Sequence, residues 1–74
     1  MQITIKLFAT LQEGRFSSEV RGYDQGAVVK QVVDDLGINE KEAALIFVNG
    51  RHAEMNQELN DADTLAIFPP VGGG

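Results

Sequence analysis

The chain has 74 residues, of which 43% are hydrophobic, and a net charge of −5 from eleven acidic and six basic residues. This size predicts a single domain with a modest core. With no cysteine and one histidine, the sequence excludes disulfides, thiolate metal sites and sites built on several histidines. The acidic balance disfavours nucleic-acid binding, and no apolar stretch approaches the length of a membrane span. We therefore expect a monomeric, cytoplasmic protein with no metal site and no signal peptide.

The first residues alternate between apolar and polar side chains. Ile3, Ile5 and Leu7 fall on one side of the chain, and the polar residues between them fall on the other. This period of two predicts a half-buried strand. Gly14 marks a turn, and residues 16–23 are expected to form a second, weaker strand. The chain is thus predicted to begin with a hairpin.

Residues 24–38 change to a helical period. Their apolar face, at spacings i, i+3, i+4 and i+7, consists of Val29, Val32, Val33 and Leu36. Gly37 is placed to end the helix in a left-handed conformation, with Ile38 folding back onto the last turn. Valine lowers intrinsic helix propensity, so we expect this helix to depend on packing against a sheet.

Three further strands are predicted in the second half of the chain. An apolar run over residues 43–48 predicts a central strand, and the Asn-Gly pair that follows is a strong hairpin signal leading to a short strand over residues 51–54. Leu59 is an isolated apolar anchor in a turn-rich segment. Residues 64–68 form the last strand, which Pro69 ends because proline cannot donate a ladder hydrogen bond.

The order of these elements is strand, strand, helix, strand, strand, strand. It predicts an α+β fold in which a mixed sheet carries one main helix packed on one face. This is the β-grasp, or ubiquitin-like, arrangement. We expect it to span residues 1–68 and to be followed by an extended tail over residues 69–74.

Several combinations of reactive side chains are better explained as solvated surface or turns. They are Ser17-Ser18 with His52, the helical pair Asp34 and Asp35, and the loop pair Asp61 and Asp63. With a single histidine, distant in sequence, a serine nucleophile could be assembled only by coincidence. Adjacent helical carboxylates point apart, and the loop lacks the rest of a calcium-binding motif. The terminal glycines do not connect a strand to a helix, so they do not form a phosphate-binding loop. We expect His52 to be a surface ring.

The tail itself has a distinctive composition. Pro69 and Pro70 predict a short stiff stem that points away from the sheet, with Val71 as a single apolar anchor. The last three residues have no side chains, and the six tail residues span about 20 Å when extended. A carboxylate on such a stem fits a narrow channel in a second protein, where attack on ATP would give an acyl-adenylate. The alternative is a frayed end or an expression remnant.

Four short motifs carry a family resemblance: "LFA" near the start, "VNG" after the apolar run, "L-x-D-x-D" before the last strand and "FPPVGGG" at the end. Together they resemble the MoaD/ThiS family of sulfur carriers over the whole length of the chain. The ending is the most specific of the four. It resembles the small subunit of molybdopterin synthase more than the thiazole-pathway carrier ThiS.

The resemblance implies a mechanism. A MoeB-like activating enzyme would use ATP to adenylate the carboxylate of Gly74, and a sulfur donor would convert it to a thiocarboxylate. The tail would then enter a MoaE-like large subunit of molybdopterin synthase, forming a hetero-oligomer. There the sulfur would pass to a pyranopterin precursor of the molybdenum or tungsten cofactor. The chain would bind no cofactor and would not itself be an enzyme.

The resemblance also implies roles for individual residues. Gly73 and Gly74 match the family's reactive diglycine, and Gly72 fills its variable position. The residues expected to contact partners are Phe8, Phe68, Pro69, Pro70, Val71 and Gly72. For the two phenylalanines, core packing is the rival explanation.

Alternatives and departures from the family pattern remain. The carrier could supply sulfur for thiazole or cysteine synthesis or for tRNA thiolation. The chain could instead be attached to lysines as a modifier, or it could be a plain interaction domain. Val28 stands where the family often has a threonine that caps the helix, so Asp24 or a water would have to accept the free N–H groups. Ala62, in the turn before the last strand, would be strained if its φ were positive.

Overall fold

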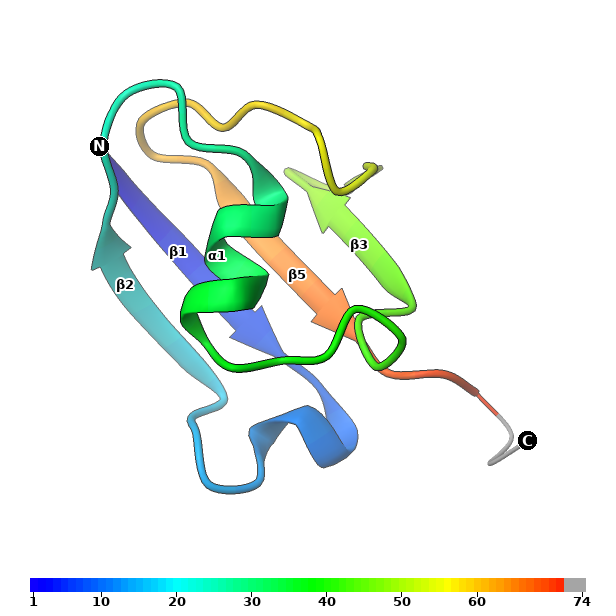
Figure 1. Cartoon of the computed structure of the whole chain (residues 1–74). Helices are drawn as coiled ribbons and strands as arrows, with labels where there is room; N and C mark the ends of the chain where they lie inside the picture. The colour runs from blue at the N-terminus through cyan, green and yellow to red at the C-terminus, as the bar shows by residue number, and fades with distance from the viewer. Residues whose placement is uncertain (72–74) are drawn as a thin grey trace.

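The computed structural model describes residues 1–71, which form one sheet with a helix across one face (Figure 1). In chain order the elements are β1 (Gln2–Leu7), the 3₁₀ helix η1 (Ala9–Gln12), β2 (Ser18–Gly22), α1 (Val29–Asp35), β3 (Leu45–Val48), β4 (Arg51–His52) and β5 (Thr64–Phe68). The strand order is β2-β1-β5-β3-β4, with β1 and β5 parallel and all other neighbours antiparallel. The predicted β-grasp fold is confirmed.

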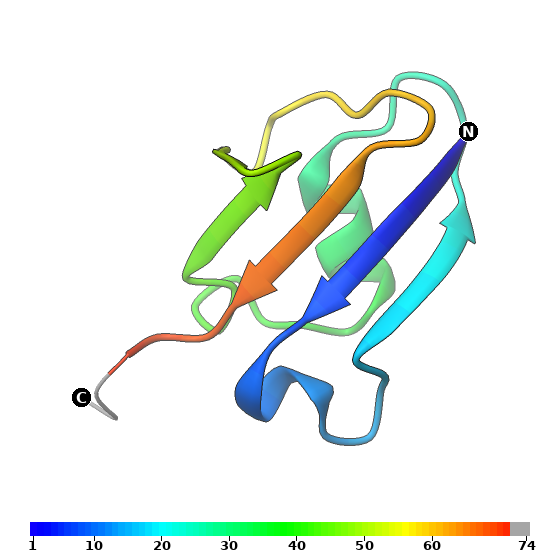
Figure 2. The ribbon, with the colours of Figure 1, turned by 180° about the vertical axis from the view of Figure 1, so that it is seen from behind.

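Alternation along the strands places every second side chain beneath α1. The fully buried side chains of the two layers include Ile3, Ile5, Leu7, Leu65 and Ile67 from the sheet, and Val29, Val32 and Val33 from the helix. Burial of each such side chain contributes about 1.5–3 kcal/mol, so this layer holds most of the stabilising apolar area. Leu59 is also buried, at 1% exposure, as predicted for an isolated anchor. Among residues 1–71, no helix covers the opposite face of the sheet (Figure 2).

The start of α1 differs from the expectation that Asp24 or a water serves its free N–H groups. The amides of Val29 and Lys30 donate to the backbone carbonyls of Gln57, at 2.9 Å, and Met55, at 2.8 Å. The side-chain oxygen of Gln31 accepts from the Val28 amide at 2.8 Å. A loop distant in sequence therefore satisfies the helix, which explains why it forms without a capping hydroxyl.

The end of α1 follows the prediction. Gly37 has a φ of +70°, and the Ile38 amide donates to the Val33 carbonyl at 3.1 Å. Ile38 is buried beneath the last turn. In addition, the Arg15 guanidinium donates through Nη2 to the Gly37 carbonyl at 3.2 Å and through Nε to the Leu36 carbonyl at 3.1 Å. These two hydrogen bonds hold the segment after η1 against the end of α1.

Three strands differ from the expectation. β2 is shorter than the predicted 16–23, β3 begins at Leu45 instead of residue 43, and β4 ends at His52 instead of residue 54. β3 is also not the central strand, because β5 occupies the middle of the sheet. The continuous apolar run suggested a strand buried on both faces. Leu45 instead points to the open face, where it is 39% exposed.

The predicted division between a domain and a tail stays a prediction, since residues 72–74 lie outside the described part of the chain. Within that part, β5 ends at Phe68. Over residues 1–71, no helix combines the length and the apolar character that a membrane crossing requires.

Candidate functional site

An aromatic cluster lies on the open face of the sheet, at the point where β5 ends. The Phe8 and Phe68 rings are stacked, with centroids 4.1 Å apart and planes 7° from parallel. Phe47 meets the Phe68 ring edge-on at 5.8 Å, and His52 meets Phe47 edge-on at 6.0 Å. Stacked and edge-on rings at these separations attract each other. The cluster therefore joins side chains from β3, β4, β5 and the end of β1.

Strand register brings these rings together. The parallel pairing of β1 with β5 sets Leu7 opposite Ile67, so the residues that follow, Phe8 and Phe68, become neighbours. Because Leu7 and Ile67 face the helix, Phe8 and Phe68 face the other way. The antiparallel pairing of β3 with β5 then sets Leu45 opposite Phe68. These side chains form an open-face patch, defined here as Phe8, Leu45, Phe47, Ala66 and Phe68.

Exposure distinguishes this patch from the core. The three phenylalanines are half-buried, and Leu45 is exposed. None of the three rings belongs to the buried core cluster or packs against it. Phe8 and Phe68 thus pack on each other instead of filling the interior. Their contact with partners stays a prediction.

The tail leaves the sheet directly from this patch. Pro69 is half-buried beside it, Pro70 is exposed, and Val71 is 86% exposed. Figures 1 and 2 both show this segment running away from the end of β5. The predicted reactive residues, Gly73 and Gly74, and the variable Gly72 lie outside the described residues.

Four residues of this region were missed from the sequence, among them Ala66, which lies between two buried residues of β5. Leu45 and Phe47 could have been found from strand parity, since both alternate with the buried Ile46. Ala9 carried no signal, yet it follows Phe8 with a φ of +51°. A left-handed conformation is unfavourable for alanine, and here it turns the chain from β1 into η1. The amide of Phe8 meanwhile donates to the Ile67 carbonyl at 3.3 Å, which fixes its position beside β5.

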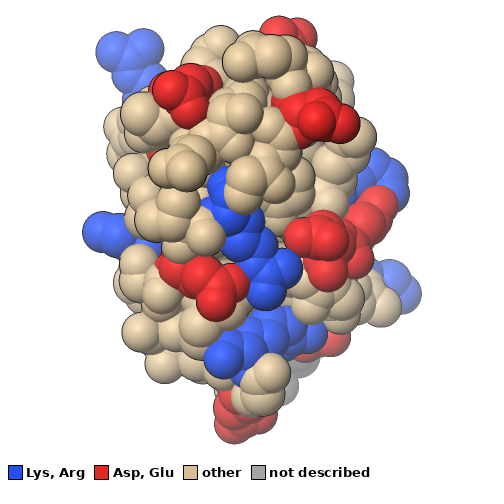
Figure 3. Space-filling view, turned by 90° about the vertical axis from the view of Figure 1, so that its left-hand side faces the viewer, with Lys and Arg blue, Asp and Glu red and all other residues tan. Residues whose placement is uncertain are grey.

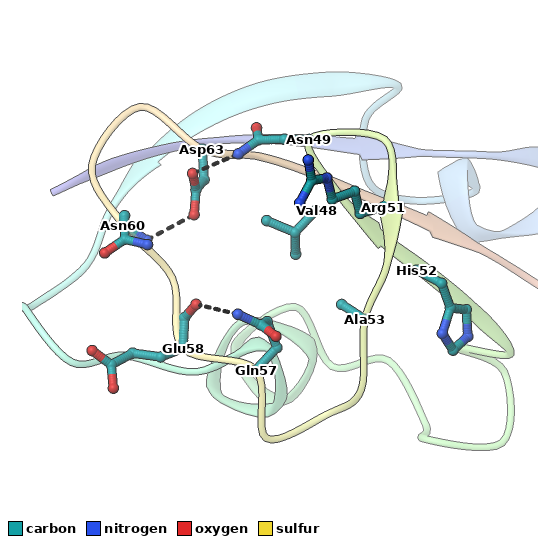
Figure 4. Close-up of a pocket in the computed structure, with 9 residues that line it drawn as sticks. All are labelled: Val48, Asn49, Arg51, His52, Ala53, Gln57, Glu58, Asn60 and Asp63. Atoms are coloured by element: carbon teal, nitrogen blue, oxygen red, sulfur yellow. Dashed lines mark hydrogen bonds between the residues drawn. The ribbon is translucent and has the colours of Figure 1, made fainter.

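A polar pocket of about 550 Å³ lies between the β3–β4 hairpin and the loop before β5 (Figure 4). Its lining residues are Val48, Asn49, Arg51, His52, Ala53, Gln57, Glu58, Asn60 and Asp63. The buried Asp63 carboxylate accepts from Asn49 Nδ2 and from the Asn60 amide, both at 2.7 Å. Gln57 Nε2 donates to the Glu58 carbonyl at 3.1 Å. These groups stabilise the loop, and the pocket is at the opposite end of β5 from the tail.

The carboxylates that the sequence analysis set aside have structural partners. Asp34 pairs with Lys30 Nζ at 2.9 Å, while Asp35 accepts from the Tyr23 hydroxyl at 2.9 Å. Burial, and then the hydrogen bond and charge of Asp35, raise the pKa of Tyr23 to about 12. His52 is exposed, as predicted. Among residues 1–71, no group of histidines and carboxylates is arranged to hold a metal ion.

The family model of the ThiS family matches residues 5–74 of this chain. The chain belongs to the ThiS family. No curated protein matches it. Among solved structures, it is similar to the Haloferax volcanii HVO 2177 protein, with 29% identity, a TM-score of 0.82, and coverage of 100% of this chain and 87% of the other.

It is also similar to SAMP1 from Haloferax volcanii, with 27% identity, a TM-score of 0.77 and full coverage of both chains. A third similar structure is molybdopterin converting factor subunit 1 from Pyrococcus furiosus, with 26% identity, a TM-score of 0.75, and coverage of 96% of this chain and 99% of that one. The protein is thus a sulfur carrier of the ThiS/MoaD type or a ubiquitin-like small modifier. Carriers of this type are non-catalytic.

Proposed function

We propose that this protein carries sulfur for the synthesis of molybdopterin, as the small subunit of a molybdopterin synthase-type complex. The observation that carries the proposal is the continuity of the open-face patch with the proline stem. Phe68 is the last residue of β5 and also the centre of the patch, stacked on Phe8 and touched by Phe47. A partner that covers the patch therefore receives the tail at a defined position.

The chemistry of the tail follows from its terminal carboxylate. An oxygen of the Gly74 carboxylate attacks the α-phosphate of ATP on a MoeB-like enzyme, and pyrophosphate leaves. A sulfur nucleophile supplied by a donor then displaces AMP, which yields the thiocarboxylate. In a MoaE-like subunit this sulfur attacks a carbon of the pyranopterin precursor that bears an oxygen leaving group, and that C–O bond breaks as the C–S bond forms. Water then hydrolyses the resulting thioester. Sulfur stays on the product and the carboxylate is regenerated.

The folded domain contributes binding and positioning to this cycle. Aromatic side chains are enriched at the energetically dominant positions of protein interfaces, because they bury a large area with little loss of side-chain freedom. The patch offers three such rings beside the stem. Glycine at the end of the tail lets the backbone pass where side chains would collide.

The choice of pathway rests on two supports. The Phe-Pro-Pro-Val ending, residues 68–71, resembles that of molybdopterin synthase small subunits. The similar Pyrococcus furiosus protein is described as molybdopterin converting factor subunit 1. A second candidate is attachment to lysines, since the small archaeal modifier protein 1 of Haloferax volcanii is also similar, with 27% identity. Both candidates use the same activated carboxylate.

The test uses the full chain, a MoeB-like enzyme, ATP and a sulfur source, followed by intact mass measurement. We expect one oxygen to be replaced by sulfur, and transfer to the precursor after a MoaE-like subunit is added. Deletion of Gly74 should abolish charging without changing the thermal unfolding midpoint, because the tail lies beyond β5. Gly72→Ala, at the variable position, is the matched control and should still be charged.

Three outcomes are informative. An unchanged mass in the presence of a competent activating enzyme contradicts the carrier function. Charging without transfer to the precursor contradicts the molybdopterin pathway and leaves the modifier candidate. Normal charging of a chain with valine in place of Gly73 and Gly74 contradicts the argument that a bare backbone is needed.

A further inference from the structure

In the described part of the chain, strand β2 forms an edge of the sheet, with β1 on one side only. Met1 and Tyr23 exchange two backbone hydrogen bonds, at 2.8 and 2.9 Å, and so form a hydrogen-bonded pair. Such pairs alternate along an antiparallel ladder. In β2, the residues that lie between hydrogen-bonded pairs are Ser18, Val20 and Gly22. They therefore direct their N–H and C=O groups away from β1. That outer edge is available for a further strand.

The side chains of β2 divide between the two faces. Val20 lies opposite Thr4 on the open face and is 57% exposed, unusually high for a valine in a strand. Glu19 and Arg21 lie on the helix side. Arg21 Nε contacts Glu19 at 2.6 Å, and Arg21 Nη1 contacts Asp35 at 3.2 Å. Seen from this edge, acidic side chains lie on both sides of a central band of basic ones (Figure 3).

We propose that β2 pairs in an antiparallel manner with β2 of a second copy of the chain, with the two Val20 residues opposite each other. The outward N–H and C=O groups of the two Val20 residues then bond to each other, and Ser18 pairs with Gly22 of the second copy. The two valines make an apolar contact on the open face. On the helix side, Glu19 lies opposite Arg21 of the second copy, and this pair occurs twice because the contact is two-fold symmetric.

The charge pattern selects both the second copy and the register. A shift of two residues in one direction sets Glu19 against Glu19, and a shift in the other sets Arg21 against Arg21. Like charges directly opposite each other are destabilising, so only the register centred on Val20 is complementary. Arg21 can accept the additional carboxylate because Nη2 makes no hydrogen bond or ion pair among the described residues.

The proposed contact leaves the functional site free. β2 is at one edge of the sheet, whereas β3 and the proline stem are at the other side of β5 (Figures 1 and 2). A dimer formed through β2 would leave the two open-face patches and the two proline stems, Pro69 and Pro70, outside the contact. The contact modifies the expectation of a monomer, and it holds whether or not the chain carries sulfur for molybdopterin.

The experiment uses two charge variants, Glu19→Arg and Arg21→Glu, with sedimentation velocity up to millimolar concentrations. Wild type should self-associate. Each variant alone places like charges opposite each other twice, which should weaken self-association by about tenfold or more. An equal mixture of the two variants restores both opposite-charge pairs and should form a heterodimer. Glu54→Arg, which changes the same charge at an exposed site away from β2, should associate as well as wild type.

Val20→Pro tests the backbone part of the contact. It removes an outward N–H, which β1 does not use, and proline is tolerated on the free side of an edge strand. We expect loss of self-association with the circular dichroism spectrum retained. The proposal is overturned if wild type stays monomeric at millimolar concentration, or if its association is unaffected by these changes. It is equally overturned if an equal mixture of the two charge variants fails to associate. If Val20→Pro does not fold, the two charge variants still test the proposal.

Discussion

The two faces of the sheet are built from the same strands but carry different side chains. Ile67 and Phe68 are consecutive residues of β5, yet Ile67 is fully buried under α1, and Phe68 is half-buried on the open face. The helix-covered face encloses a continuous aliphatic core, whereas the open face exposes three phenylalanine rings beside the proline stem. The comparison teaches that the alternation of a single strand is enough to separate a buried aliphatic core from a half-buried aromatic cluster.

Truncation at the two neighbouring positions should give opposite results. Ile67→Ala opens a cavity in the core and should lower the free energy of unfolding by about 2–5 kcal/mol. Phe68→Ala removes a stacked ring that is already partly in water, so its cost should be about 1 kcal/mol. For binding to a MoaE-like subunit the order should reverse, with Phe68→Ala weakening it by about 30-fold or more. Urea unfolding and titration calorimetry measure the two quantities.

For a domain of this size the loss at Ile67 is a large share of the total stability. Binding by the Ile67→Ala protein should therefore be measured at a temperature where it is still folded. Equal unfolding energies for the two variants would show that the open-face patch is part of the core. Unchanged binding by Phe68→Ala would show that partners dock elsewhere.

Much of the helix-covered face was predictable from the sequence. The alternation of Ile3, Ile5 and Leu7 is a local pattern, and so is the spacing of the valines in α1. Both follow from the geometry of one element and need no knowledge of its neighbours. Gly37 was equally predictable, because its place after the last apolar turn identifies a left-handed cap.

The open face and the helix start depend on contacts between distant segments. The stacking of Phe8 on Phe68 requires the parallel register of β1 and β5, which no local pattern records. The carbonyls of Met55 and Gln57 cap α1 from a segment that has little periodicity of its own. Sequence reasoning named Phe8 and Phe68 through a family resemblance, while Phe47, the third ring, went unnoticed.

Matched backbone changes before and within β5 sharpen the comparison. Ala62 has a φ of +71° in the turn before β5 and donates its amide to the Gln2 carbonyl at 2.8 Å. Glycine removes the left-handed penalty of alanine, and the gain exceeds the added freedom of the unfolded chain. Ala62→Gly should stabilise the protein by about 0.5 kcal/mol, visible as a rise of a few degrees in the thermal midpoint.

Ala66→Gly is the matched control for that substitution. Ala66 lies within β5 on the open face, where an extended backbone favours alanine over glycine by about 0.5–1 kcal/mol. The same chemical change should therefore lower the midpoint at this position. A destabilising effect at both alanines would show that the positive φ of Ala62 carries no appreciable strain.

A pH-dependent effect concerns Tyr23, whose hydroxyl donates to Asp35 of α1 at the rim of the helix-covered face. Burial, with the hydrogen bond to Asp35 as the second cause, raises the pKa of Tyr23 from its ordinary value near 10 to about 12. The folded state therefore favours the neutral phenol. Below pH 10 the phenol is neutral in both states, and its contribution to stability is complete. Above pH 10 the unfolded chain ionises first, so this contribution is lost progressively towards pH 12.

Tyr23→Phe isolates this contribution from the titration of the lysines, which both proteins share. Near pH 9 the variant should be slightly less stable, because the hydrogen bond to Asp35 is missing and such a bond contributes about 1 kcal/mol or less. The difference should shrink as the pH approaches 12, since only wild type has a phenol to ionise. Urea unfolding of both proteins over this range measures the difference directly. A constant difference at every pH would mean that Tyr23 titrates alike in the folded and unfolded chain, which would contradict the effect of burial and of Asp35 on its phenol.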